Sequence, residues 1–309
     1  MPPLTIAIRN HGLTQPLKDG RVRLGSHTVQ FIQVDPIVAA MRRMVRGLEF
    51  DMCEMAFTTY MCAKAYGKPI TAIPVFLSRA FHHRAIFYNV NSQIKTPKDL
   101  EGRTVGVNRG YTVTTGLWAR GILHTEYGVD LDKITWAPTN DEHVAEYQAP
   151  ANVDYSHRGQ SISDLLLSGT IEAAVGDIRV DSPDIQPLIP DAQSAGFAYF
   201  RKTGVYPINH GLVVKDSLLQ AVPGLAQEIF NSFEAAKNMY LTHLDGGENI
   251  SPADETALAI KQVVGDPFPF GVGANRKALD TIVEFAVDQH VIPRKFSFEE
   301  LFAEGTLNL

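Results

Sequence analysis

Short apolar segments alternate with helical segments along most of the chain. Runs rich in branched, aromatic and sulfur-containing residues predict strands at Leu4–Ile8, Thr28–Val34, Phe50–Met55, Ile70–Phe76 and Ala85–Tyr88. Between the second and third runs, Asp35–Gly47 has a helical pattern, with Pro36 expected in its first turn and Gly47 at its C-terminal cap. Because strands and helices alternate, we expect α/β layers with a largely parallel sheet.

The alternation continues through the rest of the chain. Further strands are predicted at Arg103–Val107, Ile134–Trp136, Glu172–Gly176 and Ile208–Val214, and further helices at Gly116–Tyr127, Ile162–Gly169, Pro223–His243, Ala278–Gln289 and Phe298–Phe302. Val144–Gly159 is polar and weakly periodic, which predicts a long loop. A chain of 309 residues exceeds one typical core, so two lobes are expected.

Composition narrows the possible partners of this chain. The hydrophobic fraction of 45% and the charged fraction of 20% are typical of a globular protein. A net charge of -6 argues against a nucleic-acid partner, and no segment is typical of a membrane span. Two cysteines, Cys53 and Cys62, exclude a disulfide framework. The first residues lack the pattern of a secretory signal, so we expect a cytoplasmic protein.

Candidate chemistry is densest around the third and fourth predicted strands. Glu54 lies among apolar residues, where a charge is costly to bury unless it is paired or protonated. Arg79 follows an apolar strand and is expected to bind a ligand carboxylate, or alternatively to pair with Glu54. Glu54 itself would orient a histidine or accept a substrate hydroxyl proton. These residues predict a site that binds an anion and moves a proton.

Four histidines are candidate proton donors, because imidazole titrates near neutral pH. His82 and His83 are adjacent, so on an extended backbone only one of them would point to a given face. His11 follows the first strand, where α/β clefts form, and His210 lies on a strand that returns to the first lobe. Each has a plainer alternative, as a structural histidine or as the cap of a turn.

A second group of candidates lies beyond residue 110. Hydroxyl-bearing residues at the start of the Gly116–Tyr127 helix are expected to bind an anion, or alternatively only to cap the helix: Tyr111, Thr112, Thr114 and Thr115. Asp177 and Arg179 end a predicted strand, and they would contact a ligand or form a local salt bridge. The histidines and Glu54 match no recognised metal-ligand motif, so a divalent metal has only weak support and none is expected. No organic cofactor is expected.

Three segments resemble the type II periplasmic-binding-protein fold. They are TPKDLEGRTVGV at Thr96–Val107, the hydroxyl-rich stretch Tyr111–Thr115, and LLLSGTIEAAVGD at Leu165–Asp177. The resemblance implies two α/β lobes joined by two crossover strands, with a ligand cleft between the lobes. It implies a discontinuous lobe I of residues 1–90 plus 208–309, and a lobe II of residues 91–207.

A narrower resemblance concerns three other segments. FDMCEMAFTTY at Phe50–Tyr60, IPVFLSRAFHHRAIFYN at Ile73–Asn89 and WARGILHTEYGVD at Trp118–Asp130 resemble the 4,5-dihydroxyphthalate decarboxylase family. The resemblance implies a carboxy-lyase that converts 4,5-dihydroxyphthalate to protocatechuate and CO2. It implies a small aromatic dicarboxylate as partner. No nucleic acid or membrane partner is expected from the composition, and a homo-oligomer is left open.

Two other functions are compatible with the same fold resemblance. One is a non-catalytic solute-binding protein for an aromatic or sulfonate-like anion. The other is a different lyase on the same scaffold, such as a chorismate-dehydrating enzyme.

Overall fold

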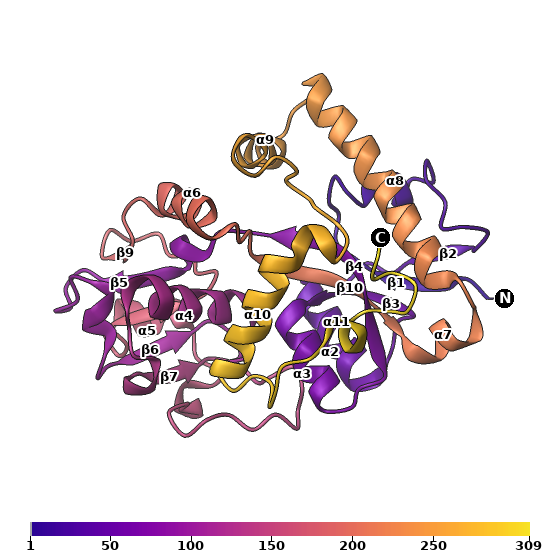
Figure 1. The fold of residues 1–309 in the computed structure, drawn as a ribbon. Coiled ribbons are helices and arrows are strands. Elements are labelled where there is room, and N and C mark those ends of the chain that lie inside the picture. The colour runs from indigo at the N-terminus through magenta and orange to yellow at the C-terminus, as the bar shows by residue number, and fades with distance from the viewer. Residues whose placement is uncertain (1) are drawn as a thin grey trace. The chain divides into compact units, whose positions relative to one another are not determined.

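The computed structural model describes residues 2–309, so Met1 lies outside the described residues. The chain forms two compact units (Figure 1). Unit 1 comprises Met1–Arg79, Ile208–Asp280 and Phe296–Leu309, and unit 2 comprises Ala80–Pro207 and Thr281–Lys295. Each unit contains a five-stranded mixed sheet and helices, so the expected α/β architecture in two lobes is confirmed.

The bounds of the units differ from the expected division in two places. Residues 80–90 and 281–295 were expected in the first lobe, and both belong to unit 2. Ring contacts explain this difference, because the Trp118 ring stacks on the His82 ring at 6.4 Å and meets the Phe285 ring edge-on at 5.6 Å.

The sheet of unit 1 has the strand order β2-β1-β3-β10-β4. Its strands are β1 (Leu4–Ala7), β2 (Val29–Phe31), β3 (Met52–Ala56), β4 (Ile70–Arg79) and β10 (Ile208–Lys215). β1 is parallel to β2 and β3, but β10 is antiparallel to both β3 and β4. β10 thus runs against the other four strands, so the sheet is largely parallel, as expected, with the exception of β10. This strand comes from a distant part of the chain and lies between two earlier strands.

The helices of unit 1 are α1 (Gln15–Lys18), α2 (Ile37–Gly47), α3 (Phe57–Ala65), α7 (Asp216–Ala221), α8 (Leu225–Gly246), α9 (Pro252–Val264), the 3-10 helix η5 (Gly273–Asn275) and α11 (Phe298–Leu301). α10 (Arg276–Asp288) begins in unit 1 and ends in unit 2. Pro36 is the N-cap of α2 and not part of its first turn. The C-cap is Leu48, with a left-handed φ of 48°, and not Gly47.

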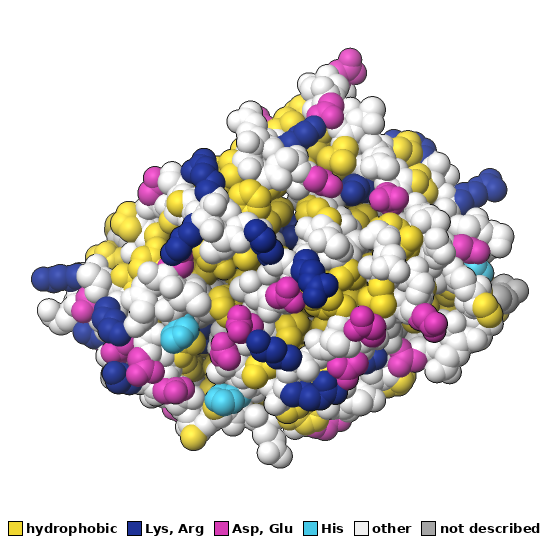
Figure 2. All heavy atoms as spheres, viewed as in Figure 1, with side chains coloured by type: hydrophobic (Ala, Val, Ile, Leu, Met, Phe, Trp, Pro, Cys, Tyr) yellow, Lys and Arg dark blue, Asp and Glu magenta, His cyan; other side chains and the backbone are white. Residues whose placement is uncertain are grey.

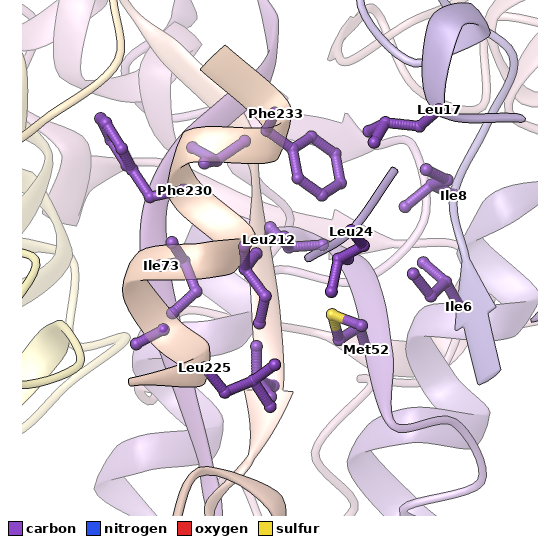
Figure 3. Packing of buried hydrophobic residues seen from close by; sticks show 14 of the residues in the cluster. Ile6, Ile8, Leu17, Leu24, Met52, Ile73, Leu212, Leu225, Phe230 and Phe233 are labelled. Atoms are coloured by element: carbon purple, nitrogen blue, oxygen red, sulfur yellow. The ribbon is translucent and has the colours of Figure 1, made fainter. Parts of the chain in front are cut away.

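One hydrophobic core of unit 1 lies between the sheet and α8. Leu225, Phe230 and Phe233 of α8 pack with strand residues such as Ile73 and Leu212 (Figure 3). This burial of apolar surface is the main stabilising contribution that α8 makes to the sheet.

The sheet of unit 2 has the order β7-β6-β8-β5-β9. Its strands are β5 (Ile86–Asn89), β6 (Thr104–Val107), β7 (Thr135–Pro138), β8 (Ala173–Val175) and β9 (Ile185–Pro187). β6 is parallel to its neighbours β7 and β8, whereas β5 is antiparallel to its neighbours β8 and β9. This sheet, too, is mixed.

The helices of unit 2 are α4 (Thr114–Tyr127), α5 (Ile162–Leu167), α6 (Ala192–Thr203) and the 3-10 helices η1 (His82–Ala85), η2 (Pro97–Leu100), η3 (Leu131–Lys133) and η4 (Tyr155–His157). Basic and acidic side chains are interspersed on the face shown in Figure 2. Among the described residues, no helix is both long enough and apolar enough to span a bilayer.

We expect Phe233→Ala to lower the free energy of unfolding by about 3–5 kcal/mol, because it removes a fully buried ring from the core of unit 1. Urea titration followed by circular dichroism would measure the change. Met239→Ala, at an exposed position on the same helix, is the control and should change stability by less than ~1 kcal/mol. Equal losses in both variants would contradict the assigned core.

Candidate functional site

A buried carboxylate lies at the centre of the unit 1 sheet. Glu54 is on β3 and has no exposed surface. Arg9 and His11 follow β1, and His210 is on β10. β1 and β10 are the two neighbours of β3, so the strand order brings these three basic side chains to Glu54. We call Arg9, His11, Glu54 and His210 the Glu54 cluster.

Five donors surround the Glu54 carboxylate. Its Oε1 accepts hydrogen bonds from Nε of Arg9 at 2.9 Å, Nη2 of Arg9 at 2.7 Å and Nδ1 of His210 at 2.7 Å. Its Oε2 accepts from the backbone N–H of Arg9 at 3.0 Å and from Nε2 of His11 at 3.3 Å. Both carboxylate oxygens are therefore engaged by the protein.

The cluster keeps Glu54 ionised. Burial alone would raise the pKa of Glu54, but the hydrogen bonds from His11 and His210 outweigh burial and hold the pKa well below its ordinary value. A carboxylate with a low pKa and five donors is a weak base. Of the two roles expected for Glu54, the geometry favours orienting a histidine over accepting a substrate proton.

The hydrogen bond to Glu54 sets the tautomer of His210. A nitrogen 2.7 Å from an ionised carboxylate oxygen must carry a proton, so Nδ1–H of His210 donates to Oε1. In the neutral ring, Nε2 then has the lone pair. Burial lowers the pKa of His210, and the hydrogen bond to Glu54 opposes this only in part. His210 is therefore a neutral imidazole at pH 7 that can accept a proton at Nε2.

A cavity of about 720 Å³ adjoins the cluster at His11. Its walls come from the β1–α1 connection, α8, the start of α9 and Phe268, and they include Leu13, Leu77 and Tyr240. This volume is within the range of small-molecule sites, which are mostly apolar with a few polar groups. Unit 1 thus has space for a small organic ligand in contact with His11.

Arg79 lies apart from Glu54 in the sheet. It ends β4, which β10 separates from β3, so the alternative of an Arg79–Glu54 ion pair is wrong. Nη2 of Arg79 donates to the carbonyl oxygen of Pro269 at 3.1 Å and to Oδ1 of Asn275. Arg79 therefore holds the 269–275 segment, and its role toward a ligand carboxylate stays a prediction.

His82 and His83 belong to unit 2 and do not have an extended backbone. Both lie in η1 and both are buried, so the extended backbone on which only one of them would point to a given face is not present. Nε2 of His83 is 3.0 Å from Oε2 of Glu126, and its ring meets Tyr199 edge-on at 5.6 Å. His83 and Glu126 thus form a second carboxylate–imidazole pair.

The hydroxyl-rich turn before α4 binds the side-chain carboxylate of Glu142. The backbone N–H groups of Tyr111 and Thr112 donate to the Glu142 carboxylate at 2.5 and 3.0 Å. Thr114 and Thr115 are the first two residues of α4, which begins two residues earlier than expected. The predicted anion-binding turn exists, and in this structure Glu142 binds there.

Asp177 and Arg179 follow β8 and are exposed. The carbonyl oxygen of Asp177 accepts from Nδ2 of Asn108 at 2.5 Å. Among the described residues, Asp177 and Arg179 do not form an ion pair with each other, and their ligand role stays a prediction.

Within residues 2–309, no group of three or more His, Cys, Asp or Glu side chains is arranged to hold a metal ion. In the Glu54 cluster, the Arg9 guanidinium lies at Oε1 where a cation would bind. The absence of a metal requirement stays a prediction.

Two important residues were missed by the sequence reasoning. Arg9 had a visible signal, because it precedes His11 at the end of the first strand. Glu142 had none, because it lies in an irregular segment without periodicity.

Comparison with known proteins gives three relevant similarities. A family model described as NMT1/THI5 like matches residues 39–229. A 4,5-dihydroxyphthalate decarboxylase of Comamonas testosteroni is 29% identical over 98% of this chain and 97% of its own length. A protein of the same name from Pseudomonas putida is 30% identical over 64% of this chain and 81% of its own length.

The fold has a solved counterpart. A Candida albicans protein, described as exhibiting the generic periplasmic binding protein structural fold, is 13% identical with a TM-score of 0.57. The alignment covers 100% of this chain and 98% of that protein. The expected periplasmic-binding-protein-like fold is therefore confirmed.

We expect His83 to make unit 2 less stable at acidic pH. Burial lowers the pKa of His83 below the ordinary value of 6.5, and the bond to Glu126 opposes this only in part. Below pH 6.5 the unfolded chain therefore binds more protons at His83 than the folded protein does. The contribution of neutral His83 to the free energy of unfolding is fully present above pH 6.5, and it is lost as the pH falls toward the lowered pKa. The Tm of His83→Gln should fall less between pH 7.5 and 5 than the Tm of the unmodified protein. His124→Gln, at an exposed position on α4, is the control; an equal effect of both substitutions would contradict the assignment.

Proposed function

We propose that this chain, which belongs to the NMT1/THI5-like family and to the 4,5-dihydroxyphthalate decarboxylase family, decarboxylates a hydroxylated aromatic carboxylate without oxidation. The proposed substrate is 4,5-dihydroxyphthalate, and the proposed products are protocatechuate and CO2. Two imidazoles that share one buried carboxylate are the observation that carries the mechanism. The alternative of a non-catalytic solute-binding protein is not favoured, because both relatives are named as enzymes.

The reaction needs two proton transfers. An aryl carboxylate loses CO2 slowly, because the electron pair left behind lies in an sp2 orbital outside the ring π system. A hydroxyl para to that carboxylate changes this. When the phenol loses its proton and the ring carbon bearing the carboxylate gains one, a dienone forms. The carbon–carbon bond electrons then pass through the ring to the carbonyl oxygen as CO2 leaves.

The histidines of the Glu54 cluster are suited to these two transfers. In the proposed mechanism, Nε2 of His210 takes the phenol proton, and Glu54 stabilises the imidazolium that forms at Nδ1–H. His11 enters the cycle protonated on both ring nitrogens: it keeps its Nε2–H bond to Glu54 and donates the Nδ1 proton to the ring carbon. After CO2 leaves, His210 returns its proton to the phenolate, and His11 takes one from solvent. One proton is consumed for each CO2 released, and no redox partner enters the balance.

Glu54 and Arg9 act through the histidines in this mechanism. Glu54 holds both rings by one nitrogen each, so the other nitrogen of each ring can face a substrate. Arg9 neutralises the Glu54 charge at 2.7 Å. The cavity beside His11 offers apolar walls to a ring. The proposal requires no organic cofactor.

Incubation of the purified protein with 4,5-dihydroxyphthalate in D2O should release CO2 and give protocatechuate with one deuterium. The deuterium should be on the ring carbon next to the remaining carboxylate, because the solvent-derived proton replaces CO2. Proton NMR and mass spectrometry would measure this. Chorismate and phthalate serve as comparison substrates, and turnover of chorismate alone would contradict the proposed substrate.

We expect His210→Gln to lower kcat by about 10²–10⁴-fold with a small effect on KM, because glutamine removes the proton acceptor but has a size similar to that of histidine. Glu54→Gln should also lower kcat and should shift the acidic limb of the kcat–pH profile, since the imidazolium loses its counter-ion. His27→Gln is a matched control, because His27 is a partly buried histidine beside Glu228 instead of Glu54. A His210→Gln enzyme as active as the control would rule out this role.

A further inference from the structure

The backbone turn at residues 110–112, which we call the carboxylate turn, binds one carboxylate through four donors. Oε1 of Glu142 accepts from the N–H of Tyr111 at 2.5 Å and from the hydroxyl of Tyr155 at 2.9 Å. Oε2 accepts from the N–H of Thr112 at 3.0 Å and from the Thr112 hydroxyl at 2.6 Å. All four donors contact the carboxylate group, so they would bind a carboxylate from any source.

The turn is shaped closely around this group. A Cβ on Gly110 would lie 2.6 Å from Oε2 and 2.8 Å from Cδ of Glu142, so any other residue at this position would displace the Glu142 carboxylate. Glycine at position 110 therefore allows the backbone to approach the carboxylate.

A buried cation beneath the turn has an unused donor. Arg120 has no exposed surface, and its Nη2 donates to the carbonyl oxygen of Tyr111 at 2.8 Å. Nη1 has no hydrogen-bond partner among residues 2–309. It faces the first turn of α4, 3.2 Å from where a Cβ on Gly116 would lie. A buried guanidinium with a spare donor at this place points to an additional acceptor.

Glu142 itself is on an irregular segment. Residues 139–154, between β7 and η4, contain no helix or strand. A side chain on such a segment can leave its partners at a lower cost than one on a central strand.

We infer that Glu142 is an internal competitor for a ligand carboxylate at the carboxylate turn. The ligand is an aromatic dicarboxylate, and one of its carboxylates takes the place of Glu142 on the turn. The ligand class rests on the proposed function. The exchange replaces one carboxylate by another on the same four donors, and Arg120 supplies a further donor. The apparent affinity for the ligand is the intrinsic affinity multiplied by the fraction of molecules in which the turn is free of Glu142.

Calorimetry with phthalate, which lacks the hydroxyl groups needed for turnover, tests the competition. Glu142→Gln and Glu142→Ala should each lower the Kd of phthalate by about tenfold or more, because the competitor is weakened or removed. Glu146→Gln is the matched control, since Glu146 is exposed on the same segment and the charge change is the same. Adding Thr112→Val to Glu142→Gln should reverse the gain. Unchanged or weaker phthalate binding in both Glu142 variants would overturn the inference.

Acetate tests whether the turn binds a free carboxylate. At constant ionic strength, sodium acetate should raise the Tm of Glu142→Ala in a saturable way, and should not do so for the unmodified protein or Glu146→Gln. The same small effect of acetate on all three proteins would count against the inference. If Glu142→Ala does not fold, the phthalate titration of Glu142→Gln remains decisive.

These outcomes are separable from the proposed function. An unmodified protein that does not decarboxylate 4,5-dihydroxyphthalate, together with acetate binding in Glu142→Ala, would remove the function and leave the competition. Normal decarboxylation without any gain in the Glu142 variants would remove only the competition.

Discussion

An ionised carboxylate in the middle of a sheet is stable only when donors replace the water that it has lost. Glu54 has five such donors, and they come from segments far apart in the sequence: Arg9 and His11 after β1, and His210 on β10. This requirement links the strand order of unit 1 to its chemistry. A carboxylate that must be surrounded holds two imidazoles in fixed orientations, which is what proton transfer to a bound ring needs.

Two of the buried carboxylates, Glu54 and Glu142, are supported in different ways. Glu54 is on a central strand and is bound by basic side chains, whereas Glu142 is on an irregular segment and is bound mainly by backbone N–H and hydroxyl groups. Glu54 is expected to stay in place, because its departure would leave Arg9 without a counter-ion. The Glu142 carboxylate can be replaced by another, since its donors fit any carboxylate.

Local patterns predicted much of the secondary structure and part of the site. An acid among apolar residues and a histidine at the end of the first strand correctly placed Glu54 and His11 in one group. The pairing of Glu54 with Arg79 was wrong, because β10 lies between β3 and β4. No local pattern indicates that a strand more than 120 residues downstream enters the sheet at that position.

The sequence by itself determined the α/β class, the two-lobed fold and the chemical types present, because periodicity and residue chemistry are local properties. Only the tertiary structure decided which charges meet. It paired Glu54 with Arg9, brought Glu142 to the turn before α4, and buried His82 and His83 in a 3-10 helix. The physical reason is that ion pairs depend on which strands are neighbours, and non-local contacts determine strand order.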